Sequence, residues 1–311
     1  MALGKLLSKV AKYLKVEYRG LRECLAEFMG TFVLVVFITG SSMQQVLSRQ
    51  TSTAAAYLSG GIGVMLAFYM CGGISGGCFN PAVSLALCLT GRKPWRVLPW
   101  HTLGQMVGAF VAAALVYSVY TEALDTFDGG TRYLLGPNGT AAIFCSFPQE
   151  YLSTTQGFGD SALATGMLIL CCLPVIDKRN MNVPPWFYPI SIGLIVLAIV
   201  GSFGFNSGAV INPAKDLGPR VFILIAGWGS ETFSFRDYNW FWIPLVAPLV
   251  GTVISCFIYW IVIENHWPEE GSVDIEKASQ ETYRAESEAA PVVLSALSLS
   301  ETGKINHAYV T

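Results

Sequence analysis

Six stretches of the sequence are apolar enough and long enough to cross a lipid bilayer as helices. The hydrocarbon core is ~30 Å thick and needs about 20 helical residues to cross it. Composition agrees, because 53% of the 311 residues are hydrophobic and 13% are charged, against about 25% charged in soluble domains. We therefore predict an all-α membrane protein. The stretches are roughly Leu25 to Val46, Ala54 to Cys71, Leu98 to Tyr120, Ala162 to Ile176, Phe187 to Phe205 and Phe241 to Ile263.

Two further segments look helical but are too short to cross a bilayer. They run from about Asn80 to Leu89 and from about Asn212 to Ile225, and each follows a glycine-rich stretch. A backbone of that kind cannot lie bare in lipid, since its polar groups would have no partners. The sequence therefore predicts two re-entrant half-helices among six transmembrane helices.

Lysine and arginine predict how the chain is oriented. Eleven of them lie before the first span and in the connections at 92–96 and 178–179, whereas the alternate connections carry three. Basic residues accumulate on the cytoplasmic side of membrane proteins. We expect an integral protein of the plasma membrane with both termini in the cytoplasm.

The two short segments begin with the same motif. Residues 75–82 and 207–214 share Ser-Gly-x-x-x-Asn-Pro-Ala, and the copies are 132 residues apart. Three spans fall in each half, and an odd number of spans inverts the second copy in the membrane. Asparagine is a favoured N-cap, and proline is favoured at the first helical position. The two half-helices should therefore meet N-terminus to N-terminus near the midplane. The motif residues are Asn80, Pro81, Ala82, Asn212, Pro213 and Ala214.

This meeting point has a definite chemistry. Two helix macrodipoles direct positive ends at one path, and each asparagine offers amide N–H donors. The extended stretches Gly72 to Phe79 and Gly204 to Ile211 leave backbone carbonyls free as acceptors. Neutral hydrogen-bonding solutes should pass while cations are repelled. The alternative is that both motifs are merely helix starts packed inside a membrane protein.

At these residues the chain resembles the aquaporin (major intrinsic protein) family, over roughly Arg22 to Pro268. The likeness includes an Ala-Glu-Phe sequence at Glu27, both Asn-Pro-Ala motifs, and the run from Asp216 to Arg220. Asp216 resembles the aspartate that marks the glycerol-conducting, or aquaglyceroporin, branch. The resemblance implies a right-handed bundle with inverted repeats, forming a homotetramer in the bilayer with one pore per subunit. It also implies passive conduction of water, glycerol and small neutral solutes such as urea, with ions and protons excluded.

Four positions correspond to the family's outer constriction: Gly60, Val200, Ala209 and Lys215. None is aromatic, and the small residues Gly60 and Ala209 should widen the path for glycerol and urea. Lys215 departs from the arginine that the family almost always has there. Arginine offers a planar, rigid set of donors, whereas lysine carries a single charge on a flexible chain. The positive charge is therefore kept, but the orientation of a bound solute should be less strictly fixed.

Three further residues carry expectations, two of them from the resemblance and Asn138 from its own sequence pattern. Glu27 is similar to a buried glutamate that braces a pore loop, although an interfacial glutamate is the alternative. Its second-half counterpart falls near Asp160 and Ser161, so no glutamate occurs there and the bracing must differ. Cys78 precedes the first motif and is a possible mercurial site. Asn138 begins an Asn-Gly-Thr glycosylation pattern, or an unused chance match.

The resemblance and the composition together predict three regions. Residues 1–22 form a basic cytoplasmic segment, and residues 23–267 form the channel domain, with repeats at about 23–120 and 160–265. Residues 268–311 are polar and lack apolar periodicity, so we expect a disordered cytoplasmic tail.

Other classes are disfavoured. A water-selective aquaporin is the nearest alternative. An ion-coupled transporter needs midplane carboxylates, for which Glu27, Asp160 and Asp216 are the few candidates. Net charge is −2 with scattered basic residues, which excludes nucleic-acid binding. The three histidines are far apart, and none has a Cys or His at metal-ligand spacing, so we expect no enzyme, no cofactor and no metal site.

Overall fold

The computed structural model describes residues 10–49, 52–268, 280–282 and 284. Contacts divide the chain into two units, Met1–Trp260 and Ile261–Thr311, and the helical bundle lies in the first. Within the described residues the only β-pairing is an isolated bridge between Tyr133 and Gly139. Most of the expected tail at 268–311, and residues 1–9 of the expected basic segment, lie outside the described residues.

Six helices in the described part are long and apolar enough to cross a membrane, as predicted. Two begin earlier than the apolar pattern indicates: α2 starts six residues before Leu25, and α6 starts eight before Ala162. Apolar windows locate only the lipid-facing part, whereas hydrogen bonding continues into polar turns; at α6 the Ser153 side chain caps the start by accepting from Gln156 N. The six helices are α2 (Arg19–Ser48), α3 (Thr53–Ser75), α5 (Leu98–Asp128), α6 (Thr154–Ile176), α7 (Tyr188–Ser207) and α10 (Ile243–Val262).

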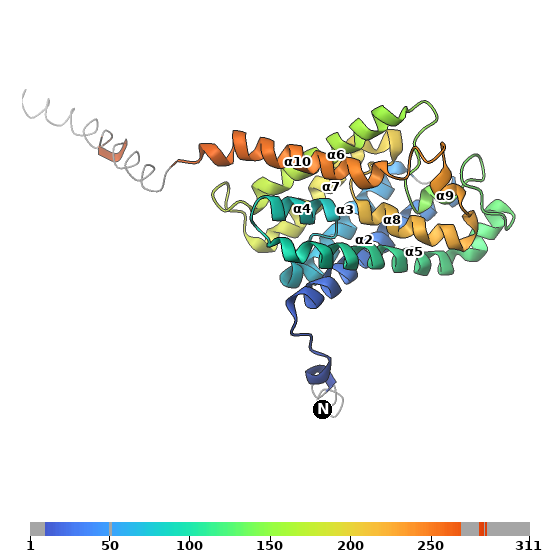
Figure 1. Ribbon diagram of the computed structural model, residues 1–311, viewed down its shortest axis with the longest axis horizontal. Coiled ribbons are helices and arrows are strands. Elements are labelled where there is room, and N and C mark those ends of the chain that lie inside the picture. The colour runs from blue at the N-terminus through green and yellow to red at the C-terminus, as the bar shows by residue number, and fades with distance from the viewer. Residues whose placement is uncertain (1–9, 50–51, 269–279, 283, 285–311) are drawn as a thin grey trace, which may run out of the picture. The chain divides into compact units, whose positions relative to one another are not determined.

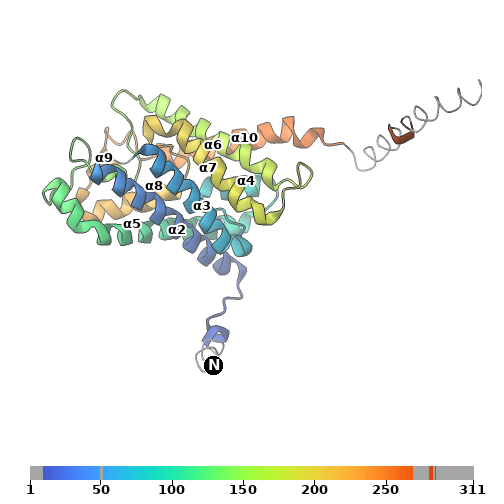
Figure 2. The same cartoon turned by 180° about the vertical axis from the view of Figure 1, so that it is seen from behind.

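The two half-helices are α4 (Pro81–Leu89) and α8 (Pro213–Ile223). Their N-caps are Asn80 and Asn212, each followed by proline at the first helical position, as predicted. Figures 1 and 2 show α4 and α8 end to end in the middle of the bundle. The second half-helix ends two residues before the predicted Ile225, because a π-helical turn, η4 (Leu224–Trp228), follows it.

The remaining elements are short. They are the 3₁₀ turns η1 (Trp95–Val97), η2 (Ala141–Ile143), η3 (Pro185–Phe187) and η5 (Glu264–His266), and the single-turn helix α9 (Glu231–Ser234).

Small residues allow the long helices to cross closely. Gly104 and Gly108 of α5 face backbone carbonyls of α2, and a Cβ at either position would overlap Cys24 O or Phe28 O. The second half repeats this arrangement, since Gly251 of α10 lies against Ala162 O of α6. Spacings of small residues four apart are typical of membrane helix interfaces. The matching crossings in both halves agree with the predicted duplication.

The two halves join through α3 and α7. A Cβ on Gly61 would lie 2.9 Å from Gly193 O, and one on Gly193 would lie 2.7 Å from Gly61 O. These two glycines are 132 residues apart, the same offset as the Asn-Pro-Ala motifs. The tight crossing of α3 and α7 therefore follows the symmetry of the repeat.

Candidate functional site

The two Asn-Pro-Ala motifs are joined by reciprocal hydrogen bonds. Asn80 Nδ2 donates to Ile211 O at 2.8 Å, and Asn212 Nδ2 donates to Phe79 O at 2.9 Å. Each carboxamide oxygen caps its own helix, accepting from Ala82 N in one case and from the Ala214 and Lys215 amides in the other. A carboxamide nitrogen carries two N–H groups. One is therefore used to fix the asparagine, and the second is left for a passing oxygen.

The non-helical backbone before each motif is shorter than predicted, because α3 continues to Ser75 and α7 to Ser207. What remains has the same unusual conformation in both copies. Gly76 and Gly208 have φ of 81° and 83°, and the next residues, Gly77 and Ala209, have φ of 70° and 52°. Left-handed residues break the helical hydrogen-bond pattern, so the carbonyls that follow need other partners. These stretches line the central cavity on both sides of the motifs. Each half of the protein thus supplies carbonyl acceptors as well as an asparagine donor.

A cavity of about 530 Å³ runs along these groups. All four residues assigned to the constriction by resemblance, Gly60, Val200, Ala209 and Lys215, line it. Asn80, Asn212, Cys78 and Asp216 also line it, whereas the other motif residues, Pro81, Ala82, Pro213 and Ala214, are buried behind the wall. The structure therefore brings the predicted pore residues from both halves to one continuous surface.

The constriction residues leave space. A Cβ added to Gly60 would meet only Ile38 Cγ1, at 3.6 Å, which is ordinary van der Waals contact. In the described part of the chain no hydrogen bond or ion pair is formed by the Lys215 side chain. Its ammonium group is thus an uncommitted positive charge on the cavity wall.

Glu27 is completely buried and holds the stretch before the first motif. Its carboxylate accepts from Cys78 N at 3.1 Å, Phe79 N at 2.6 Å and Gln105 Nε2 at 2.7 Å. It is therefore not an interfacial glutamate.

The second half is held differently, in agreement with the missing glutamate. Ser161 Oγ donates to Val210 O at 2.6 Å, and Asp160 accepts from Asn206 Nδ2 at 3.0 Å. In the second half a hydroxyl group donates to a backbone carbonyl, whereas in the first half the carboxylate of Glu27 accepts from backbone amides.

Asp216 borders the cavity, but its oxygens face protein groups. They accept from Ser146 N at 2.7 Å and from Arg220 Nε at 2.8 Å. Arg220, which is fully buried, also donates to Thr232 O at 2.7 Å and Ser146 O at 2.6 Å. The sequence analysis missed this network, although the spacing of four residues between Asp216 and Arg220 on a helix was a usable signal.

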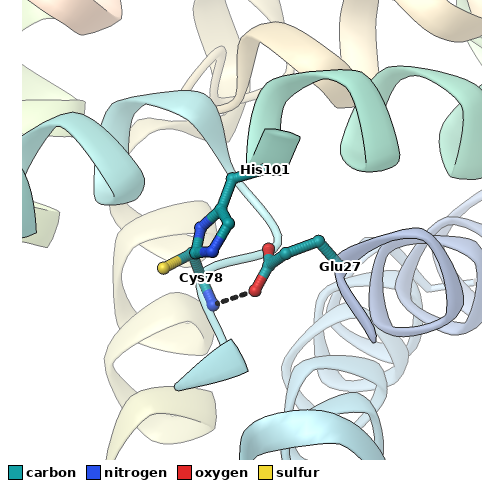
Figure 3. A group of neighbouring side chains, drawn as sticks. All are labelled: Glu27, Cys78 and His101. Carbon is teal, nitrogen blue, oxygen red and sulfur yellow. Dashed lines mark hydrogen bonds between the residues drawn. The ribbon is translucent and has the colours of Figure 1, made fainter. Parts of the chain in front are cut away.

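A second buried network was also missed. His101 of α5, which is fully buried, shares a hydrogen bond of 2.9 Å between its Nε2 and Glu23 Oε2, and lies 3.3 Å from Ser84 Oγ through Nδ1. Glu23 also forms ion pairs with Arg19 and with Lys93. Figure 3 shows that the His101 ring, Cys78 and Glu27 come together from three different segments.

Asn138 lies away from the cavity. It is exposed in the connection between α5 and α6, and its Oδ1 accepts from Arg49 Nη2 at 3.4 Å.

Comparisons with known proteins agree with this geometry. The family model for major intrinsic proteins matches residues 14–259. Human aquaporin-10 is 40% identical over 92% of this chain and 96% of its own length, and human aquaporin-9 is 45% identical over 81% and 86%. The X-ray structure of the aquaglyceroporin from Plasmodium falciparum superposes with a TM-score of 0.70 at 30% identity, covering 78% of this chain and 97% of that chain.

Proposed function

Because this chain belongs to the major intrinsic protein family, we propose that it is a passive aquaglyceroporin channel. Its solutes are water, glycerol and other small neutral molecules such as urea, and it excludes ions and protons. The observation that carries the proposal is the cavity lined by both motif asparagines and by four constriction residues without an aromatic ring. The channel lies in an integral membrane protein, and no enzymatic step is part of the proposal.

The cavity wall explains the choice of solute. Each motif asparagine offers one uncommitted N–H, and the left-handed stretches beside it offer carbonyl oxygens, so a water molecule or polyol replaces its lost hydrogen bonds. A cation finds the positive ends of α4 and α8 and the ammonium group of Lys215. Neutral solutes therefore lose little on entry, whereas a cation loses its hydration shell and meets positive charge.

Two of the predicted site residues act by positioning. Glu27 holds the loop before the first motif through backbone amides. Asp216 connects α8 to Ser146 and pairs with Arg220 of the same helix. We assign Asp216 to the shape of the outer entrance rather than to direct contact with solute.

The cellular arrangement is also proposed. The distribution of Lys and Arg supports a plasma-membrane protein with cytoplasmic termini, and family membership supports a homotetramer with one pore per subunit. Under this topology Asn138 is outside and exposed, and carries a glycan. A glycosidase-sensitive mobility shift that persists in Asn138→Gln would refute the glycan, and a monomeric mass in detergent would refute the tetramer.

Stopped-flow light scattering of proteoliposomes tests the function. Under glycerol, urea and sucrose gradients we expect fast water and glycerol flux with sucrose excluded, relative to protein-free liposomes. Glycerol flux at the control rate beside fast water flux would instead indicate a water-selective aquaporin. Accumulation of solute against its gradient would indicate an ion-coupled transporter.

A further inference from the structure

Three side chains that can bind a metal ion meet behind the first motif. Glu27 of α2, Cys78 before α4 and His101 of α5 each place one donor atom within 4.8 Å of the other two. All three are buried, with exposed fractions of 0%, 5% and 0%. Among the described residues this is the one such group of Cys, His and carboxylate side chains. Figure 3 shows the ring of His101 beside the thiol and the carboxylate.

His101 is held as a metal ligand is held. Its Nε2 pairs with the carboxylate of Glu23 at 2.9 Å, so the proton of the neutral ring belongs on Nε2. That tautomer leaves the lone pair on Nδ1, which faces Ser84 Oγ at 3.3 Å. Histidines that bind metals nearly always donate their other ring N–H to a carboxylate, carbonyl or water, which fixes the ring and raises its basicity.

Glu27 brings a negative charge that lacks a cation. Its partners are two backbone amides and Gln105 Nε2, and it forms no ion pair with any residue that the structure describes. Oε1 accepts only the longer bond from Cys78 N, at 3.1 Å, so it has a lone pair to spare. The neighbouring Gln105 Oε1 is buried without a hydrogen-bond partner. Acceptors exceed donors in this buried region, and a cation would correct that imbalance.

Cys78 supplies the entry. It lines the central cavity, whereas Glu27 and His101 lie behind it. A metal ion that enters the cavity therefore meets a thiol first and the other two ligands next. Three protein ligands with a fourth position open to cavity water match the coordination of Zn²⁺ sites that keep an exchangeable ligand.

We propose that Glu27, Cys78 and His101 form a binding site for a thiophilic divalent cation of the Zn²⁺ and Cd²⁺ class, and that its occupation closes the pore. The ligands would be Cys78 Sγ, His101 Nδ1 and Glu27 Oε1. On binding, the S–H bond of Cys78 breaks, an S–metal bond forms, and the proton leaves to cavity water; no redox change occurs. The metal competes with Cys78 N for Glu27 and adds positive charge beside Asn80.

Cadmium binding to the purified full chain tests the site independently of transport. We expect one Cd²⁺ per chain, with thiolate-to-cadmium absorption, and no displacement by excess Mg²⁺, which prefers oxygen ligands. Cys78→Ser should abolish the absorption, and Glu23→Gln should weaken Cd²⁺ binding by about 10- to 100-fold because it removes the negative charge that orients His101. Cys172→Ser is the matched control, since Cys172 lines the same cavity outside the cluster and should bind as the unchanged protein does.

Glycerol flux of each variant, divided by its own metal-free flux, tests closure. Saturating Cd²⁺ should stop most flux in the unchanged protein and in Cys172→Ser, and little in Cys78→Ser or His101→Gln. Equal binding and inhibition in His101→Gln would reduce the site to a lone thiol and overturn the proposal. The proposal would also be overturned if Cys78→Ser still bound Cd²⁺ and was still inhibited by it. Binding of one Cd²⁺ per chain without loss of glycerol flux would overturn it as well. A chain that conducts no glycerol would refute the proposed function, while the cadmium titration would still decide the site.

Discussion

Gly60 leaves one side of the conducting path without a side chain. Lys215 lies on the same cavity wall with a flexible ammonium group, and Val200 and Ala209 complete the four positions. Because Ala209 has a left-handed φ of 52°, a larger or branched residue would be strained there. At the scale of single residues, Gly60 is therefore the best position at which to change the width of the cavity. Lys215 is the best position at which to change the shape of the positively charged group.

Gly60→Phe should convert the channel toward water selectivity. The Cβ would meet only Ile38 Cγ1, at 3.6 Å, and because Gly60 lines the cavity we expect the ring to extend into it. We expect glycerol flux to fall at least tenfold and water flux to fall less, measured by stopped-flow scattering. Gly60→Ala is the control and should retain most glycerol flux. Unchanged glycerol flux in Gly60→Phe would mean that this position does not form the constriction.

Lys215→Arg should make the channel less permeable to glycerol relative to water. The guanidinium group is larger and offers fixed donors, so we expect the ratio of glycerol to water permeability to fall roughly threefold, equivalent to about 0.6 kcal/mol in barrier height. Proteoliposomes also report ion leakage through membrane potential dyes, and leakage should stay low because the charge is kept. If neither solute preference nor leakage changed, the lysine would be incidental.

At the scale of elements, helix crossings and helix ends hold the half-helices in place. Gly104 and Gly108 bring α5 against α2, whose Glu27 holds the first loop. At the end of α6, Asp177 accepts from Tyr259 Oη of α10 at 3.1 Å and from the Arg179 backbone amide at 3.1 Å. Both contacts act far from the solute, so they should affect stability before selectivity.

Gly108→Ala should destabilise the fold. The added methyl group would overlap Phe28 O, and overpacking of this kind typically costs about 1–3 kcal/mol. Gly40→Ala is the matched control in α2, because no atom lies within 4 Å of its added Cβ; it should be neutral or stabilising by about 0.4–1 kcal/mol. Thermal unfolding in detergent compares the two. Equal midpoints would show that the α2 and α5 crossing tolerates expansion.

Asp177 should make the stability of the fold depend on pH in the acid range. Burial raises the pKa of Asp177, but hydrogen bonds from Arg179 and Tyr259 together hold it below its ordinary value. A carboxylate with a lowered folded pKa stabilises the protein fully above its unfolded pKa, ~3.9. This contribution is lost as pH falls through the lower folded pKa. Above about pH 4 the unfolding midpoint of the unchanged protein should therefore be higher than that of Asp177→Asn. Below this pH the difference between the two midpoints should shrink.

The control for this pH dependence is Glu122→Gln. Glu122 is exposed at the far end of α5, so its removal should leave the acid profile unchanged. A difference between the protein and Asp177→Asn that stays constant throughout the acid range would contradict the linkage.

At the scale of the whole molecule, one buried ion pair lies at the centre of a network that joins several segments of the bundle. Arg220 of α8 reaches Asp216, Ser146 in the connection between α5 and α6, and Thr232 in α9. Trp240 Nε1 donates to the same Ser146 carbonyl at 3.0 Å. These contacts join four segments of the chain around one buried guanidinium group.

Arg220→Met should be severely destabilising. It leaves the carboxylate of Asp216 buried without a cation, which commonly costs about 3–5 kcal/mol. The double variant Asp216→Asn with Arg220→Met removes both charges and should recover part of that loss. Unfolding in detergent compares the unchanged protein, the two single variants and the double variant. If the double variant were less stable by the full sum of the single changes, the pair would not act as a unit.

The sequence by itself determined the elements of this protein and the motif and constriction residues of the cavity wall. Hydrophobic spans and the caps at Asn80 and Asn212 depend on local preferences that act over a few residues, so they are visible without tertiary structure. Resemblance placed Gly60, Val200, Ala209 and Lys215, and the structure brings all four to one cavity. The span limits were less accurate at α2 and α6, because helices continue past their apolar parts into polar turns.

Only the tertiary structure decided which distant polar groups meet. Glu27, Cys78 and His101 come from three elements, so spacing along the chain predicted no metal site although their donor atoms lie together. The same holds for the contacts of Arg220 with Ser146 and Thr232. Their positions depend on how closely glycines let the helices cross, and a buried polar atom takes whichever partner that packing brings within reach.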